Sequence, residues 1–465
     1  MSEGPIQERP ASDIVVMKFG GTSVGTPEAR RISALKVAAA AERGVRPVVV
    51  VSAIGRKGAP YATDTLLHML REIDPDVEPD AREMDLLLAC GEILSAVIFA
   101  HTLKTIGHPA QAYRGGQAGI RTDGVYGNAR ILSINPHSIF RSLENGFIPV
   151  ICGFQGVFSP EAGTPGGELT TLGRGGSDTT AAAMGAAMGA RAVEIYTDVD
   201  GVKTADPDAV RNAPTLHRVT YDEVAEIAHL GAKVVHPRAA EVAMAYGIPL
   251  WVKNTFSDDP GTEIVPRDAF PGRRATGVTH TGKLTYLQFD LSPAERSHRA
   301  ELESRIFETM ERYGVQLFML NVSPTSTGFA VPRGQYGIVE NVLDGLVLPV
   351  AGSIYVFQIG ETSPEVETQA QLLAPLGDVR RVVAGLTEGT TMVSLVGHEF
   401  MQQAGLYASV LQTLADAEIP VLQTSDSEFS LSVLVAEGEG GRAVKLLHDR
   451  FDLGAVALMA LLRRG

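Results

Sequence analysis

The stretch GELTTLGRGGSDTTAAAMGAAMGA, residues 167–190, places a glycine-rich loop directly before an alanine-rich helix. The glycines predict a turn, and the alanines predict a helix that packs closely on a sheet. A turn alone does not explain why Arg174 and Asp178 flank the Gly-Gly-Ser sequence at 175–177. Backbone amides exposed at the start of a helix attract anions, so this loop is predicted to bind one.

The composition of the 465-residue chain is that of a globular protein of about three domains. Its formal net charge of −14 argues against a nucleic-acid or membrane-surface partner, because phosphate groups would be repelled. Residues 1–13 have no apolar core, which predicts a disordered tail and no signal peptide. No run approaches the ~18 apolar residues of a membrane span. Cys90 and Cys152 lie among apolar residues, as buried thiols do, and we expect a cytoplasmic protein.

From Ile14 to about Val265, short β-rich runs alternate with helical ones. This pattern is typical of an α/β fold with a mostly parallel sheet covered by helices. Buried strands are predicted at 14–19 and 47–53, and the helix that starts at Ala81 is apolar nearly all round, which predicts a place in the core. Further strands are expected at 146–156, 191–201 and 248–254.

A segment rich in proline, glycine and charge, residues 257–274, marks the expected domain boundary. Beyond it, the runs from Glu303 and Leu406 repeat one order of features: a helix, a β-rich run, a Ser/Thr-rich turn and an alternating strand. The repeat predicts two small α+β modules of β-α-β-β-α-β type. The stretch 349–389 between them is longer than a plain connection and is left unassigned.

The sequence KFGGTSVG, residues 18–25, follows a buried strand and combines open glycine amides with Lys18. It lacks the residue order of a Walker A loop, and GRGGSD does not match GxGxxG, so neither a P-loop nor a dinucleotide fold is supported. Other polar residues also stand at strand ends or helix starts. The carboxyl ends of the strands in an open α/β sheet line one crevice, which predicts a single ligand site. These residues are Lys18, Ser52, Arg174, Asp178, Thr197 and Asp198.

Glu92 is placed differently, because it lies inside the apolar helix next to Gly91. A glycine inside a helix costs roughly 1 kcal/mol relative to alanine, which indicates that another group approaches the backbone there. A buried carboxylate needs a positive partner. The residues leave open whether that partner is a cation of the protein or the ammonium of a ligand.

Seven segments resemble, in family order, those of the aspartate kinases of the amino-acid-kinase superfamily with C-terminal ACT domains. They are VMKFGGTSVG, VVVVSAIGRKGAPYATDTLL, EMDLLLACGEILSA, GFQG, TLGRGGSDTTAAA, IYTDVDGVKTADP and GAKVVHPRAAE. The resemblance implies a three-layer catalytic domain at 14–274. It also implies ACT-like modules at 280–350 and at 351–465, the second with an extra connecting segment.

The resemblance implies that ATP, with Mg²⁺, phosphorylates the side-chain carboxylate of L-aspartate to 4-phospho-L-aspartate. This is the first step towards lysine (through diaminopimelate), threonine and methionine. An amino-acid end product is expected to inhibit the enzyme from the ACT-like modules, which pair in a homo-oligomer, a dimer. Two alternatives stay open: a kinase for another amino-acid carboxylate, and a non-catalytic amino-acid sensor.

Residue roles are carried over from the matching motifs. Lys18 and Asp178 are the expected catalytic residues, and no metal ligand of the protein is assigned. The residues expected to bind aspartate are Thr63, Glu92, Arg174 and Ser177. The residues expected to bind ATP are Lys18, Phe19, Gly20, Gly21, Ser52, Thr197, Asp198, Lys203, Asp206 and Lys233. Asn321 and Gln423 are the expected effector contacts.

Two positions depart from the family pattern. Lys203 stands where an aromatic or apolar residue near the base is common, and Asp208 where an arginine near the phosphates is common. Either Lys203 replaces the missing cation, or ATP affinity is weak. His236, in the matching His-Pro pair, is expected to cap or pack a helix and not to act in catalysis.

Overall fold

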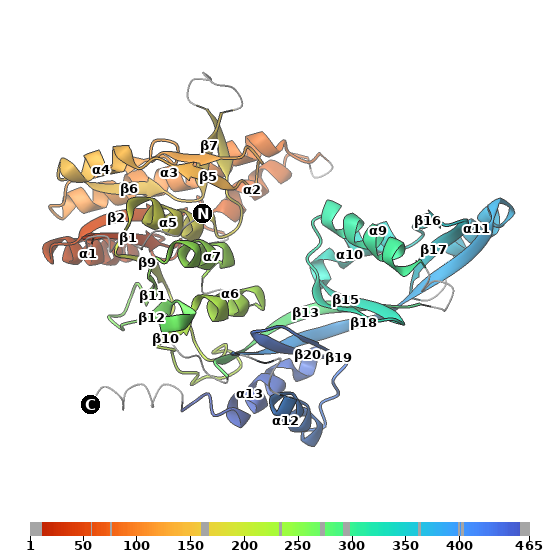
Figure 1. The fold of residues 1–465 in the computed structure, drawn as a ribbon. Coiled ribbons are helices and arrows are strands. Elements are labelled where there is room, and N and C mark those ends of the chain that lie inside the picture. Colours follow the sequence, from red (N-terminus) through yellow and green to blue (C-terminus); the bar gives the residue numbers. More distant parts are fainter. Residues whose placement is uncertain are drawn as a thin grey trace, which may run out of the picture. The chain divides into compact units, whose positions relative to one another are not determined.

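The computed structural model describes residues 12–56, 58–74, 77–159, 167–231, 235–269, 275–291, 298–360, 364–398, 400 and 404–455. They divide into two compact units (Figure 1). The first consists mainly of the described residues of Met1–Thr204 and Pro214–Gly272, and the second of Ala205–Ala213 and Arg273–Gly454. Most of the predicted tail, and the predicted domain limit at 274, lie outside the described residues.

An eight-stranded sheet forms the middle of the first unit. Its order is β10-β12-β11-β9-β1-β2-β6-β3, and the β11–β12 pair is its antiparallel one. The strand predicted at 14–19 is confirmed as β1, with every residue buried. The bounds are β1 Ile14–Phe19, β2 Arg46–Val51, β3 Ala110–Tyr113, β6 Ile148–Cys152, β9 Ala192–Thr197, β10 Arg218–Thr220, β11 Leu250–Asn254 and β12 Thr262–Val265.

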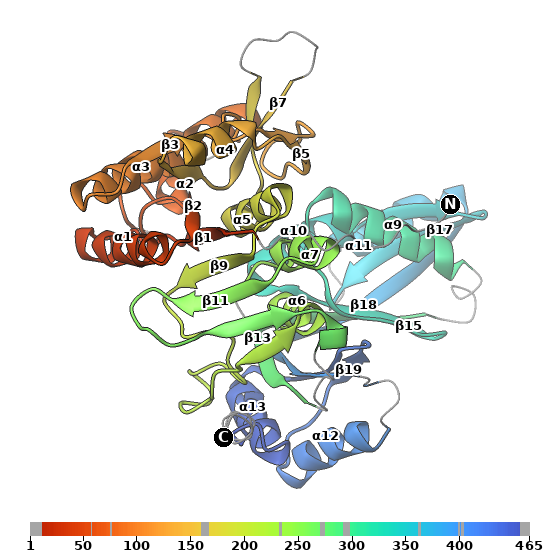
Figure 2. The same cartoon turned by 60° about the vertical axis from the view of Figure 1, so that its left-hand side comes forward.

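Helices cover both faces of this sheet, which confirms the three-layer α/β architecture (Figure 2). Side chains alternate along a strand, so Val15, Met17 and Phe19 of β1 face a core shared with α1 and α3. Lys18 therefore faces the layer that contains α5. The helices are α1 Pro27–Glu42, α2 Thr63–Arg71, α3 Ala81–Thr105, α4 His137–Glu144, α5 Gly176–Met188, α6 Tyr221–His229 and α7 Pro237–Tyr246.

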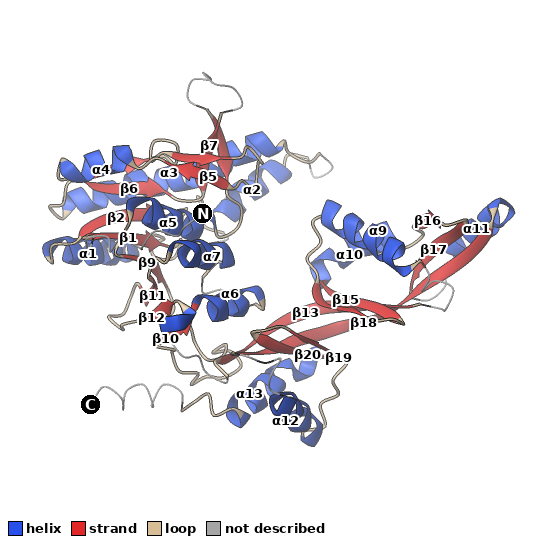
Figure 3. Ribbon diagram, in the orientation of Figure 1, coloured by secondary structure: helices blue, strands red, loops and turns tan. Residues whose placement is uncertain are grey.

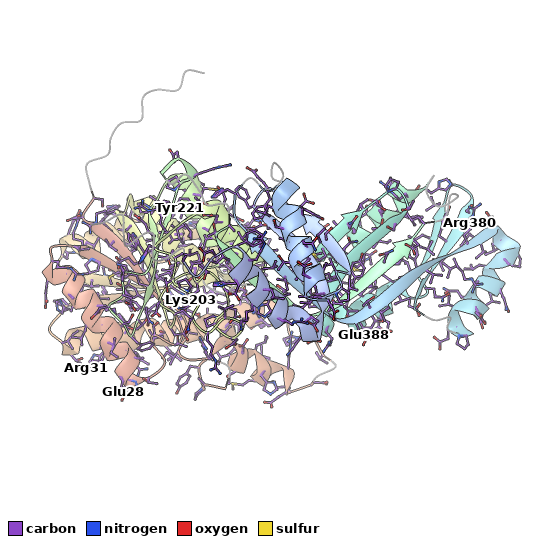
Figure 4. The ribbon with its side chains drawn as sticks, turned by 90° about the horizontal axis from the view of Figure 1, so that it is seen from below. Glu28, Arg31, Lys203, Tyr221, Arg380 and Glu388 are labelled. Atoms are coloured by element: carbon purple, nitrogen blue, oxygen red, sulfur yellow. The ribbon has the colours of Figure 1, made fainter. Side chains whose placement is uncertain are left out.

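Local sequence explains where these helices begin and how closely they pack. The hydroxyl of Thr26 accepts a hydrogen bond from the Ala29 amide at 3.1 Å and caps α1, whose Glu28 and Arg31 are exposed (Figure 4). In α5, a Cβ at Gly185 would come within 2.4 Å of the Val193 side chain on β9. The small residues of α5 thus let it lie close to the sheet.

Helix α3 is not buried all round, and that prediction was wrong. Leu86, Leu94 and Val97 are 37%, 41% and 55% exposed, and Cys90 is exposed on the same helix. The reason is that α3 packs against the sheet along one side, while its other side lies at the surface of the described unit. By length and composition α3 could cross a membrane, a test that a core helix of a soluble protein also passes.

A smaller four-stranded sheet, with the order β5-β4-β7-β8, extends the first unit. Strand β8 runs antiparallel to β7 and ends at Thr171, five residues before α5 begins. The loop between them contains Arg174, so the position of the end of β8 affects the position of the Arg174 backbone. The bounds are β4 Ile120–Thr122, β5 Ile131–Ile134, β7 Gln155–Phe158 and β8 Glu168–Thr171.

The second unit is built on the long strands β13, Gly277–Asp290, and β18, Asp378–Val396, which run antiparallel side by side (Figure 3). The sheet order is β14-β15-β13-β18-β17-β16, and β20 pairs with both β18 and β19. The remaining elements are α9 Arg299–Arg312, β14 Phe318–Val322, β15 Ser326–Pro332, α10 Arg333–Leu343, β16 Val347–Val350, β17 Ser353–Ile359, α11 Pro364–Leu373, α12 Ala404–Asp416, β19 Gln423–Asp426, β20 Ser430–Ala436 and α13 Gly440–Arg450.

The predicted repeat appears as two groups of elements along these long strands. One group is α9, β14, β15 and α10 beside the second half of β13, and the other is α12, β19, β20 and α13 beside the second half of β18. The limit expected at 350/351 falls within the β16–β17 hairpin, where Val350 pairs with Ser353. The pairing therefore favours a border within β18, and the module limits remain a proposal.

Candidate functional site

The loops after β1 and β2 pack directly on each other in the first unit. The Gly55 amide donates to the Gly21 carbonyl at 3.0 Å, and the Gly20 amide donates to the Tyr196 carbonyl at 3.2 Å. A Cβ at Gly21 would meet the Gly55 carbonyl oxygen at 2.4 Å, so this approach requires glycine. Lys18 and Ser52 thereby stand beside each other at the carboxyl ends of neighbouring strands.

Lys18 forms an ion pair with Asp178, in the first turn of α5. The Nζ–Oδ1 distance is 2.5 Å, and the two side chains are 11% and 13% exposed. A largely buried lysine needs such a partner. The pair joins the end of β1 to the start of α5, the two motifs that carry glycine-rich loops.

Gly175 caps α5 in the left-handed conformation, with φ at 73°. The ring of His236 packs against it, because a Cβ at Gly175 would come within 2.1 Å of that ring. His236 precedes α7 and its side chain makes no capping hydrogen bond, so of the two expected roles only packing is observed. Burial lowers the pKa of His236, which favours the neutral ring.

Glu92 is 2% exposed, and one of its oxygens accepts a hydrogen bond from the Ala53 amide at 3.0 Å. Within the described part of the chain, its Oε2 has no hydrogen-bond partner. Burial raises the pKa of Glu92 to about 8. Gly91 explains the approach, because a Cβ there would meet the Ala53 Cβ at 2.8 Å. Oε2 of Glu92 is therefore a buried oxygen that can accept a hydrogen bond from a ligand.

These groups meet around a cavity of about 540 Å³. It brings together Lys18, Gly21, Ser52, Thr63, Glu92, Arg174, Ser177 and Asp178. A larger cavity of about 610 Å³ lies between α5, α7 and β5, with a floor of alanines. The lining of the smaller cavity includes three cationic and four acidic side chains, so its chemistry makes it the candidate site.

Other predicted nucleotide contacts lie outside this lining. Thr197 is the last residue of β9 and Asp198 follows it, and Asp198 accepts a hydrogen bond from Arg56 at 2.6 Å. The ring of Phe19 stacks in the core on Tyr196, with centroids 4.8 Å apart, so only its backbone remains available to a ligand. The Nζ of Lys203 lies 4.0 Å from Asp200 (Figure 4).

Two further residues predicted to bind ATP are not among the described residues that line this cavity. Asp206 lies in Ala205–Ala213, the segment grouped with the second unit. Lys233 lies outside the described residues.

Sequence reasoning missed two residues near these loops. Arg56, after β2, makes the ion pair with Asp198, and no pattern in the sequence indicated it. Asp85 lines the cavity and is 0% exposed. Its signal was a carboxylate in an apolar helix, seven positions before Glu92 and hence on the same face.

The two expected effector residues lie in the second unit on strands that come close together, β14 and β19. Gln423 donates a hydrogen bond to the hydroxyl of Tyr286 at 3.0 Å. Asn321 pairs in register with Gly328 across β14 and β15.

Residues 13–254 match the amino acid kinase family, and residues 393–451 match an ACT domain. The chain is 38% identical over 447 residues to Aspartokinase 1 of Bacillus subtilis (strain 168), which covers 95% of this chain and 99% of that protein. It is 35% identical over 454 residues to an aspartokinase of Corynebacterium efficiens, covering 95% and 96%.

Solved structures share the fold. Aspartokinase III of E. coli in complex with aspartate and ADP superposes with a TM-score of 0.67 at 23% identity, over 94% of this chain and 99% of that one. The same protein in complex with lysine and aspartate gives 0.68 at 23% identity, over 95% and 100%.

Proposed function

The chain belongs to the amino acid kinase family, among the aspartokinases, and on this premise we propose how its site phosphorylates L-aspartate. The γ-phosphoryl group of ATP passes to the side-chain carboxylate and gives 4-phospho-L-aspartate. One observation carries the assignment of this chemistry to the cavity beside α5. The Lys18–Asp178 pair, Arg174 and the unpartnered oxygen of Glu92 all reach the same space.

Arg174 and Glu92 are proposed to hold the two charged ends of the amino acid. Arg174 is exposed in the loop before α5 and makes no ion pair within the described residues. Its guanidinium can grip the α-carboxylate through two charge-assisted hydrogen bonds. The α-ammonium then meets Oε2 of Glu92, and the hydroxyls of Thr63 and Ser177 complete the pocket. The partner that Glu92 requires is thus the ligand, not a cation of the protein.

Lys18 and Asp178 are proposed to act on the transferring group. Phosphoryl transfer depends on positioning and on neutralising charge more than on a protein nucleophile. Lys18 supplies positive charge to the γ-phosphoryl group, with the amides of Gly20 and Gly21 beside it. Asp178 keeps the ammonium of Lys18 oriented across the start of α5.

Mg²⁺ is part of the proposal. Among the residues that the structure describes, no three His, Cys, Asp or Glu side chains gather in a way that could hold a metal. Mg²⁺ in kinases is usually bound by substrate phosphates with one or two carboxylates. Asp178 is the carboxylate proposed to take part, and the ion would neutralise charge on the phosphates.

Adenosine and ribose are proposed to lie along Thr197, Asp198 and the loop that follows. Lys203 and Lys233 are the proposed cations of this side, with Ser52 as a further contact. Asp206 belongs to the second unit, and its role stays a prediction from the family motif. If Lys203 replaces the cation that is missing at position 208, Lys203→Ala should raise the KM for ATP.

A hydroxylamine assay tests the function, because hydroxylamine traps an acyl phosphate as a hydroxamate. With ATP and Mg²⁺, we expect product from L-aspartate and none from glutamate or N-acetylglutamate. Product from either of those compounds alone would identify a different carboxylate kinase. No product from any of them would favour the sensor.

Glu92 predicts a pH dependence. Because its pKa is raised to about 8, Glu92 is mostly protonated at pH 7, and only its carboxylate form attracts the aspartate ammonium. The kcat/KM for aspartate is therefore expected to rise with pH up to about 8 and then level off. Glu92→Gln should remove this rise and lower kcat/KM most at pH 8 and above, where the wild-type side chain is a carboxylate. If the variant kept the rise, another group would be responsible.

Feedback control and a homodimer formed through the ACT-like modules are proposed for the second unit. Strand β14 stands at an edge of the sheet and exposes Leu320 and Val322, at 47% and 44%. Pairing with a second subunit would cover this edge. An end product bound at such a junction would favour one arrangement of the subunits and so inhibit a distant site.

Titration of the full chain with lysine, threonine and diaminopimelate tests this control. We expect at least one to inhibit, and Gln423→Ala and Asn321→Ala to raise the concentration for half inhibition without changing kcat. Tyr286→Phe is the matched control for Gln423, because it removes that partner hydroxyl and keeps the amide. An enzyme that none of the three inhibits would exclude the model.

A further inference from the structure

Asp85 has no exposed surface, and both of its carboxylate oxygens accept hydrogen bonds from the protein. Its Oδ2 accepts from the Thr171 amide at 2.7 Å, and its Oδ1 accepts from the Thr171 hydroxyl at 2.6 Å. Both oxygens also lie 3.0 Å from the Gly127 amide. Within the described residues no lysine, arginine or histidine pairs with it. Burying a carboxylate is costly unless donors surround it, and here backbone amides and a hydroxyl do so.

The two segments that Asp85 holds lead to the same place. Thr171 ends β8, three residues before Arg174. Gly127 belongs to the β4–β5 turn, and that turn packs on Gly173, where a Cβ would lie 3.0 Å from the Gly127 carbonyl oxygen. Asp85 thus restrains the start of the Arg174 loop directly through β8 and indirectly through the turn.

Asp85 also shares a helix with Glu92. The two lie seven residues apart, about two turns of α3, so they face the same cavity. Both residues belong to the same helix, α3. The hydrogen bond of 2.7 Å from the Thr171 amide to Oδ2 of Asp85 ties the end of β8 to this helix. The distance between Arg174 and Glu92 consequently depends on the Asp85 contacts.

We propose that Asp85 is a positioning residue that sets the spacing between the carboxylate-binding Arg174 and the ammonium-binding Glu92. The inference rests on the proposed function, because it assigns those two roles. Asp85 itself contacts neither end of the amino acid. The ion pair of the phosphoryl side, Lys18 with Asp178, does not involve Asp85, so the loss of Asp85 is expected to leave that pair in place.

The test is steady-state kinetics on Asp85→Asn and Thr171→Val in the full chain. Asp85→Asn turns an amide group towards two backbone N–H donors, and Thr171→Val removes only the hydroxyl. We expect the aspartate KM to rise about tenfold or more in Asp85→Asn and by a smaller factor in Thr171→Val, while the ATP KM stays unchanged. Thr171→Ser, which keeps the hydroxyl, should recover most of what Thr171→Val loses.

Glu223→Gln is the matched control. Glu223 is also 0% exposed and accepts from the amide and hydroxyl of one threonine, Thr220, at 2.8 and 3.1 Å. It lies in the capping box of α6, so its replacement should lower the melting temperature and leave the aspartate KM unchanged. An equal rise in KM in this control would overturn the proposal.

Three other outcomes separate the possible failures. An Asp85→Asn enzyme with a lower melting temperature and a normal aspartate KM would make Asp85 a residue of stability only. If Asp85→Asn does not fold, an unchanged aspartate KM in folded Thr171→Val overturns the proposal. A wild-type enzyme that does not phosphorylate aspartate in the same assay would reject the proposed function instead.

Discussion

Lys18→Ala is expected to lower kcat by about 10³-fold while aspartate still binds. The reason is that Lys18 acts on charge that develops as the phosphoryl group transfers, and losing one preorganised donor of this kind costs about 10²- to 10³-fold. The variant also leaves Asp178 without its 2.5 Å partner beside the incoming phosphates, which adds repulsion. Turnover is measured by the hydroxamate assay, and aspartate binding by calorimetry.

Lys36→Ala is the control for this variant. Lys36 also forms an ion pair, with Asp258 at 3.1 Å, but it lies on α1, on the other face of the sheet. Its replacement should leave kcat within about twofold of the wild type. A Lys18→Ala enzyme with near-normal kcat would remove Lys18 from the catalytic assignment.

Arg174→Lys is expected to raise the KM for aspartate by about 10- to 100-fold with little change in the KM for ATP. A guanidinium makes two parallel hydrogen bonds to a carboxylate, and an ammonium cannot reproduce that fork. One charge-assisted hydrogen bond contributes about 1.5–3 kcal/mol, and about 1.4 kcal/mol corresponds to a factor of ten. Initial rates at varied aspartate and at varied ATP separate the two constants.

Arg130→Lys makes the same chemical change at an exposed arginine that lines the larger cavity instead. It should leave both constants unaltered. If Arg174→Lys instead raised the KM for ATP and left that for aspartate unchanged, Arg174 would belong to the nucleotide side.

Local patterns allowed much of the first unit to be predicted. The buried run at 14–19, the glycines at 20 and 21 and the loop before α5 each specify their own conformation, so strand, turn and helix start appear where expected. The same patterns misjudged α3. Apolar composition gives the number of apolar residues in a helix. It does not show which side of the helix packs against the rest of the protein.

The second unit shows a similar division. Its repeat was visible in the sequence because both groups have the same order of a helix, two strands and a second helix. The border between the two groups was not visible in the sequence, because both groups share the strands β13 and β18. In addition, the β16–β17 hairpin, in which Val350 pairs with Ser353, joins segments on the two sides of the expected border.

Residue type and order along the chain thus determined the family, the strand-end loops and the identity of Lys18, Arg174 and Asp178, because each depends on neighbours a few positions away. The tertiary structure alone decided which charges are paired and which are free. Glu92 meets the Ala53 amide from 39 positions away, and Asp85 meets Thr171 from 86 positions away. Desolvation and hydrogen bonding act through space, so the unpartnered oxygen of Glu92 and the satisfied oxygens of Asp85 become distinct only when the chain folds.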